Sequence, residues 1–124
     1  MSHDALRRRA RAALADGAER APARAHFRAM GIDPGQVEAY VDGDAAGLTP
    51  TEFRLLYALA LERGRVVTRD ELLQRVWGRR ETHRDRTVDV FVRKMREKID
   101  RRAPRHTFIQ TRYGVGYKLD AVPK

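Results

Sequence analysis

The sequence contains no cysteine, which excludes disulfide bonds and metal or iron–sulfur sites with cysteine ligands. The four histidines, His3, His26, His83 and His106, are scattered without the spacing of metal ligands. No apolar run approaches the roughly 20 residues that a membrane-spanning helix needs, and the N-terminus lacks the apolar core of a signal peptide. We therefore expect a cytoplasmic protein with no metal ion, no cofactor and no membrane partner.

Patterns that carry catalysis are missing as well. The sequence has no glycine-rich loop leading into a helix that would cradle a phosphate, and no paired carboxylates beside a histidine or a nucleophile. The glycines at 114 and 116 do not form a nucleotide fingerprint, because no helix is expected after them. We predict that the protein is not an enzyme, and no small-molecule ligand is indicated.

What the sequence has in excess is positive charge. Among 124 residues, 26 are Lys or Arg and 17 are Asp or Glu, which gives a net charge of +9. The excess is concentrated, because the segment 79–105 holds eleven Lys or Arg residues against five acidic ones. A local basic excess favours an anionic partner, and nucleic acid is the most common one.

Composition divides the chain at about residue 27. The segment 1–27 is dominated by Ala and Arg, and its one candidate helical face is thin because Ala buries little surface. We expect a flexible basic tail or linker there. The range 28–120 has the length and apolar content of one small domain, and we expect the residues after 120 to be frayed.

Short strands are expected at the start of this domain. The turn signals Asp33-Pro34-Gly35 and Asp42-Gly43 separate short apolar runs, because Asp and Gly tolerate the backbone angles of tight turns. The pattern predicts a small N-terminal antiparallel sheet between about 32 and 48.

Three helices are expected next. The segments 49–52 and 68–71 both have the Thr-x-x-Glu pattern of a capping box, which starts a helix. Gly64 and Gly78 are placed to end those two helices. A third helix is predicted from about 85 to 101.

The third helix has two contrasting faces. Its apolar residues recur at steps of four, three and four, which places them on one stripe facing the core: Val88, Val92, Met95 and Ile99. The opposite face is basic with one valine in it: Arg86, Val90, Arg93, Lys94, Glu97 and Arg101. So many cations on one side are unusual for a merely solvated helix.

A β-hairpin is expected last. Apolar residues between 108 and 119 alternate loosely around Gly114 and Gly116, which allow the chain to turn. Strands, three helices and a hairpin make an α+β fold of the winged helix-turn-helix type. The third helix is narrow enough for a major groove, and the hairpin wing can reach the adjacent backbone or minor groove.

Four segments resemble one family. The sequences at 48–56, 68–78, 85–96 and 111–117 resemble, in order, the first helix, second helix, recognition helix and wing of OmpR/PhoB-type DNA-binding domains. These are the effector halves of bacterial two-component response regulators and usually follow a phosphorylatable receiver domain. Because about 27 unrelated residues precede the sheet, we expect either a protein without a receiver or a fragment with its linker.

The resemblance and the chemistry of the side chains together give candidate DNA contacts. Candidates for base edges combine donors, an acceptor and a methyl-contacting side chain: Asp89, Val90, Arg93 and Lys94. Candidates for phosphates position the domain without reading sequence: Trp77, Arg86, Thr87, Arg96 and Thr111. The wing contributes Arg112, Tyr113 and Gly114, and Tyr113 stands where the family often has an arginine.

Two of these residues have a second interpretation. Asp89 lies near the edge of the apolar stripe, so a structural salt bridge to Arg93 or Arg86 is as well supported as a base contact. Trp77 is expected to pack against the core, and the resemblance adds a phosphate contact from its indole N–H.

The expected function is sequence-specific binding of double-stranded DNA for transcription regulation, with a dimer on direct-repeat half-sites. The alternatives are an architectural DNA-binding protein and a winged helix that binds protein. The loop before the third helix matches the place where family members touch RNA polymerase, although a plain connector is equally expected. That loop includes Arg79, Arg80, His83 and Arg84.

Overall fold

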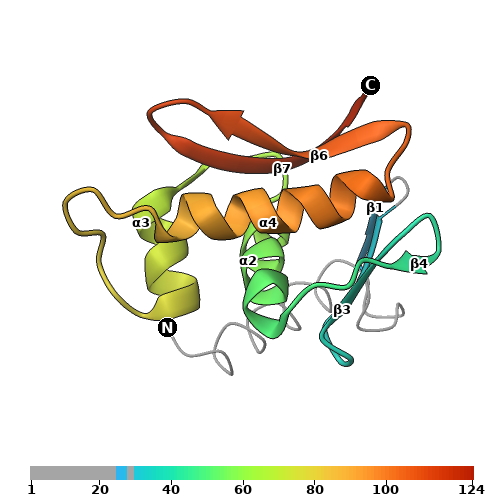
Figure 1. The fold of residues 1–124 in the computed structure, drawn as a ribbon, viewed down its shortest axis with the longest axis horizontal. Coiled ribbons are helices and arrows are strands. Elements are labelled where there is room, and N and C mark those ends of the chain that lie inside the picture. Colours follow the sequence, from blue (N-terminus) through green and yellow to red (C-terminus); the bar gives the residue numbers. More distant parts are fainter. Residues whose placement is uncertain (1–24, 28–29) are drawn as a thin grey trace.

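The computed structural model describes residues 25–27 and 30–124. It confirms the predicted α+β winged helix-turn-helix: an N-terminal antiparallel sheet, a helical middle and a C-terminal hairpin (Figure 1). The predicted tail before residue 25 lies outside the described residues. Among the described residues, no helix is long and apolar enough to cross a membrane.

The N-terminal sheet has four antiparallel strands in sequence order. They are β1 (Ala25–Phe27), β2 (Met30–Asp33), β3 (Glu38–Val41) and β4 (Asp44–Ala45). The Asp33 side chain stabilises the first predicted turn, because its Oδ1 accepts hydrogen bonds from the backbone N–H groups of Gly35 and Gln36. In the second turn Asp42 and Gly43 have φ of 51° and 86°. The sheet starts at Ala25, earlier than the predicted domain boundary at 28, because β1 pairs with β2.

The first two helices begin where the capping patterns predict. Thr49 caps α2 (Pro50–Leu61), with reciprocal hydrogen bonds between Thr49 and Glu52 of 3.2 and 2.8 Å. Thr68 caps α3 (Arg69–Leu72), which continues into one π-helical turn, η1 (Leu73–Trp77). Gly78 then ends the segment with φ of 71°, the left-handed conformation that favours glycine.

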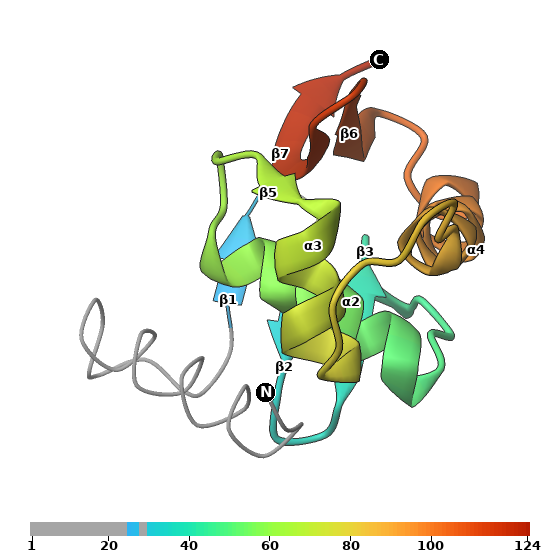
Figure 2. The same ribbon diagram turned by 90° about the vertical axis from the view of Figure 1, so that its left-hand side faces the viewer.

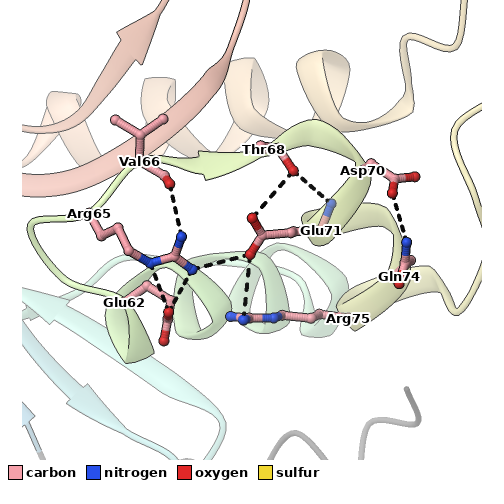
Figure 3. Close-up of polar contacts among 8 residues, drawn as sticks. All are labelled: Glu62, Arg65, Val66, Thr68, Asp70, Glu71, Gln74 and Arg75. Atoms are coloured by element: carbon pink, nitrogen blue, oxygen red, sulfur yellow. Dashed lines mark hydrogen bonds and ion pairs between the residues drawn. The ribbon is translucent and has the colours of Figure 1, made fainter.

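An ion-pair network fixes the turn between α2 and α3. Arg65 donates hydrogen bonds to Glu62 at the end of α2 and to Glu71 in α3, at 2.6 and 3.2 Å (Figure 3). Arg75 approaches the same Glu71 carboxylate at 3.6 Å. The network joins the end of α2 to α3, which the short strand β5 (Val67–Thr68) separates along the chain, and Arg65 within it is exposed.

The third helix is α4 (Thr87–Arg101), and it starts two residues later than expected. The predicted stripe is confirmed, since its four residues, Val88, Val92, Met95 and Ile99, are buried. Lys98, beside this stripe, donates a hydrogen bond of 2.6 Å to Glu52, whose residue is only 2% exposed. A buried ion pair therefore joins α4 to the start of α2.

The hairpin consists of β6 (His106–Arg112) and β7 (Gly116–Pro123), and β7 also pairs with β5. The strand β7 continues past residue 120, where fraying was expected. The end is held because Lys124 donates its backbone N–H to Arg105 and its Nζ to the carbonyl of Ala103, at 2.9 and 2.7 Å.

The helix α4 lies along the hairpin, with α2 crossing on its other side (Figure 1). Figure 2 shows the same arrangement with α4 viewed along its axis, beside α2 and α3. One apolar core joins both sheets and the helices, and its members include Met30, Phe53, Met95, Phe108 and Leu119. The face of α4 turned away from this core carries the candidate site.

Candidate nucleic-acid interface

The outward face of α4 presents basic side chains around one apolar residue. Arg93, Lys94 and Glu97 are exposed, and Val90 is 37% exposed. Arg86, Val90 and Arg93 line a shallow hollow together with Asp89 at the start of the helix. Most predicted base-contacting residues therefore share one accessible surface, as their helical spacing requires.

The start of α4 is held by Asp85, which accepts a hydrogen bond from the backbone N–H of Thr87 at 3.1 Å. Arg79 bonds both to the Asp85 carboxylate and to the Thr87 hydroxyl, the latter at 2.7 Å. We call this group of three residues the Asp85 clamp. The hydrogen bond from Arg79 and those from Thr87 hold the pKa of Asp85 well below its usual range. Two residues predicted to face partners, Arg79 and Thr87, thus also interact with each other.

Asp89 interacts with α3 and the wing. Its Oδ1 accepts a hydrogen bond from Arg69 Nε at 2.8 Å and another from the Tyr117 hydroxyl. The predicted partners Arg93 and Arg86 were wrong, because α3 brings Arg69 against the first turn of α4. Asp89 nevertheless forms a structural ion pair, as expected, with Arg69 as its partner.

Tyr117, on strand β7, contacts Asp89, Arg69 and Arg96. Burial and the hydrogen bond to Asp89 raise its pKa to about 12. The guanidinium carbons of Arg69 and Arg96 lie 5.5 and 5.8 Å from its ring centre. The sequence identifies neither Arg69 nor Tyr117 as a partner of Asp89, because both lie far from it in the chain.

Arg96 and Thr111 are joined to each other. Arg96 Nη2 donates a hydrogen bond of 2.8 Å to Thr111 Oγ1, which links α4 to strand β6. Both residues are half-buried. Two predicted phosphate contacts therefore already form a pair within the domain.

Trp77 packs at the edge of the core, as expected. Its ring contacts Phe91 on α4 edge-on, with ring centres 5.1 Å apart. Lys94 Nζ lies 5.7 Å from the centre of the same Phe91 ring. Phe91 was missed by the sequence analysis, although an aromatic residue between the two faces of the helix was a signal for such a contact.

The hairpin tip is exposed and partly apolar. Gly114 turns the chain with φ of 78°, and Tyr113 and Val115 on either side are 89% and 47% exposed. Arg112 is exposed beside them. The tip lies toward the same end of the molecule as the start of α4 (Figure 1).

The loop before α4 is exposed at Arg80, His83 and Arg84. It is held at one side by Asp70, whose Oδ1 accepts a hydrogen bond of 3.1 Å from the backbone N–H of Glu81. Across the described residues, no group of three or more His, Cys, Asp or Glu side chains could hold a metal ion.

The chain is similar in sequence to transcriptional regulatory proteins. The model of the family described as "Transcriptional regulatory protein, C terminal" matches residues 43–119. The transcriptional regulatory protein CpxR of Klebsiella pneumoniae is 43% identical over 91 residues, which cover 73% of this chain and 39% of CpxR. The chain thus spans about two fifths of the length of that relative.

Solved structures of two DNA-binding domains are similar to this chain in fold. The DNA-binding domain of CpxR from E. coli has a TM-score of 0.71 at 38% identity, covering 80% of this chain and 96% of that domain. The RstA DNA-binding domain of Klebsiella pneumoniae, solved in complex with the RstA box, has a TM-score of 0.70 at 29% identity, covering 77% and 95%. The chain belongs to the family of C-terminal, OmpR/PhoB-type winged-helix domains of transcriptional regulatory proteins.

Proposed function

We propose that this chain binds double-stranded DNA sequence-specifically and thereby regulates transcription, with α4 in the major groove. The observation that carries the proposal is the basic face of α4, where Arg86, Arg93 and Lys94 are exposed while the opposite face of the helix is buried. An α-helix with this face fits the width of the groove and matches the charge of its phosphates. The RstA domain, which shares the fold, was solved in complex with the RstA box, and this supports the proposal.

Three residues are proposed to contact base edges. Arg93 and Lys94 can donate to guanine O6 and N7, and Val90 can contact a thymine methyl group. They are exposed on adjacent turns of α4. Asp89 is proposed to orient Arg69 and the helix rather than to contact a base, because its Oδ1 already accepts two hydrogen bonds.

Phosphate contacts are proposed for Arg86, for Thr87 and for the indole N–H of Trp77, which surround the start of α4. At the wing, Arg112 is proposed to neutralise a phosphate. Tyr113, presented by the turn at Gly114, would pack against the wall of the minor groove through apolar contact rather than charge.

The wider role follows from the relatives. We propose that the chain is the DNA-binding part of a cytoplasmic response regulator, that it has no catalytic activity, and that two copies occupy direct-repeat half-sites. The exposed loop residues Arg80, His83 and Arg84 are proposed to contact RNA polymerase. The basic segment 1–27 would add affinity equally for all DNA sequences, since charge carries no base information.

The first experiment selects bound sequences from a random duplex library and then measures the affinity for the selected site against salt. We expect log affinity to fall linearly with log salt, with a slope of about −4 to −7 for five to eight phosphate contacts. Equal competition by scrambled duplex would indicate an architectural protein instead. A loss of all binding near physiological salt would favour a protein-binding module.

The second experiment compares Lys94→Ala with Arg86→Ala. Loss of a guanine contact in Lys94→Ala should weaken the selected site by about 1–3 kcal/mol and relax the preference at one base position. Arg86→Ala should weaken all sequences alike. If Lys94→Ala weakens every sequence equally, Lys94 contacts a phosphate and the assignment of base-contacting residues is wrong.

A further inference from the structure

Arg96 differs from the other cations of α4 in its surroundings. Arg93 and Lys94 are exposed, whereas Arg96 is half-buried between α4 and the hairpin. Its Nη2 donates to Thr111, and its Nε is buried with no hydrogen-bond partner among the described residues. Arg96 also borders a hollow with Asp89, Arg93 and Tyr117, so its guanidinium is bonded within the protein and only partly exposed to a ligand.

The contacts of Arg96 connect three elements. The side chain starts on α4, bonds to Thr111 on β6 and lies against the ring of Tyr117 on β7. Tyr117 in turn bonds to Asp89, one of the first residues of α4. The hairpin is therefore joined to α4 at two points, Tyr117–Asp89 near the start of the helix and Thr111–Arg96 about two turns later.

Moving the Arg96 side chain onto a DNA phosphate would cost free energy, because its contacts within the protein would be lost. The guanidinium would break its bond to Thr111 and leave the face of Tyr117, and the Thr111 hydroxyl would lose its partner. Arg86, by contrast, is exposed at the start of α4, and among the described residues its side chain forms no such contact. Charge alone makes Arg86 and Arg96 equivalent, but their environments do not.

We propose that Arg96 and Thr111 are positioning residues: their hydrogen bond holds the wing at a fixed height above the recognition helix, so that α4 and the wing tip can contact one duplex together. This inference rests on the proposed DNA binding. It gives Arg96 the role of joining the two DNA-contacting elements instead of the role of a phosphate contact.

The test uses Arg96→Met, which keeps the side-chain stem beside Tyr117, and Thr111→Val, which removes only the hydroxyl. Thr111→Ser is the conservative variant that keeps it, and Arg86→Ala is the phosphate comparator. Each protein is titrated against the selected duplex over a range of salt concentrations, and against a duplex shortened on the wing side of the site.

We expect Arg96→Met and Thr111→Val each to weaken binding to the full duplex by roughly tenfold, because a wing that is no longer held has to be ordered when DNA binds. The double variant should be no weaker than either single variant, because both remove the same interaction. Thr111→Ser should bind like wild type. The slope of log affinity against log salt should stay unchanged in Arg96→Met, whereas in Arg86→Ala it should become less steep by about 1.

The shortened duplex separates positioning from general damage to the fold. Without DNA under the wing, the misplaced wing has no consequence, so the penalty of Arg96→Met should disappear. A less steep salt slope in Arg96→Met, additive effects in the double variant, or an equal penalty on the shortened duplex would each overturn the inference. Absence of any wild-type binding to duplex would instead refute the proposed function itself.

Discussion

Replacing Lys98 with methionine should test the buried ion pair that joins α4 to α2. The Lys98 Nζ lies 2.6 Å from Glu52 Oε1, and the Glu52 side chain is 2% exposed. Removing one partner of a buried pair costs about 3–5 kcal/mol, because the other charge stays buried without compensation. The Lys98 side chain is 30% exposed, and Glu52 keeps its bond to the Thr49 N–H. We therefore expect a smaller loss in the free energy of unfolding, about 2 kcal/mol.

The measurement is urea denaturation followed by circular dichroism, with Lys94→Met as the matched control. Lys94 is exposed one turn earlier on the same helix, so the identical substitution there should change stability by less than about 0.5 kcal/mol. A loss of about 2 kcal/mol should also lower the thermal midpoint by roughly 10 °C in a domain of this size.

The difference in the free energy of unfolding between wild type and Lys98→Met should depend on pH. Burial, the largest single influence, raises the pKa of Glu52, but the hydrogen bonds from Lys98 and Thr49 prevail and lower it below its ordinary value of 4.5. A lowered pKa means that the stabilisation is present above this ordinary value and is lost as the pH falls through the lowered one. The difference between wild type and Lys98→Met should therefore be full at pH 7 and shrink in acid. A difference that stays constant down to pH 3, or one no larger than in Lys94→Met, would refute the reasoning.

Four further predictions concern the framework of the site. A Cβ at Gly116 would lie 2.0 Å from a backbone oxygen of β5, so Gly116→Ala should lower the free energy of unfolding in urea by more than about 2 kcal/mol. Gly114→Ala, with open space around a φ of 78°, should cost about 1 kcal/mol of strain. The lowered pKa of Asp85 means that the Asp85 clamp holds above the ordinary pKa and loosens only as the pH falls through the lowered value. Amide hydrogen exchange at the start of α4 should therefore be fast at neutral pH in Asp85→Asn but not in wild type. The raised pKa of Tyr117, about 12, gives stabilisation below pH 10 that is lost in alkali, and ultraviolet titration should show a lower pKa in Asp89→Asn.

The local features of the fold could be predicted from the sequence because they depend on neighbours in the chain. A Thr-x-x-Glu pattern satisfies the free N–H groups of a helix start wherever it occurs, and both predicted caps, Thr49 and Thr68, are present. The stripe from Val88 to Ile99 is buried because helical periodicity allows only one face for it. The chemistry of exposed residues such as Arg93 and Lys94 was equally evident, although their contacts with bases stay predictions.

Element boundaries were less predictable, because they depend on contacts between elements. The helix α4 begins at Thr87 because the Asp85 carboxylate turns back to accept the Thr87 N–H. The strand β7 continues to Pro123 because Lys124 is bound to Ala103 and Arg105 in the turn between α4 and β6. At β7 the deciding hydrogen bonds form only after the chain has folded back on itself, whereas at α4 the bond is local and is supported by Arg79, eight residues before Thr87.

Only the tertiary structure decided which charged side chains are available to a ligand. The sequence determined that the segment 79–105 carries many cations, since net charge is a sum over residues. It did not determine that Asp89 would bond to Arg69, which lies 20 residues earlier, or that Arg96 would bond to Thr111 on the wing. A hydrogen bond acts over about 3 Å, so its partners depend on which helices and strands meet, and that is set by the packing of the core.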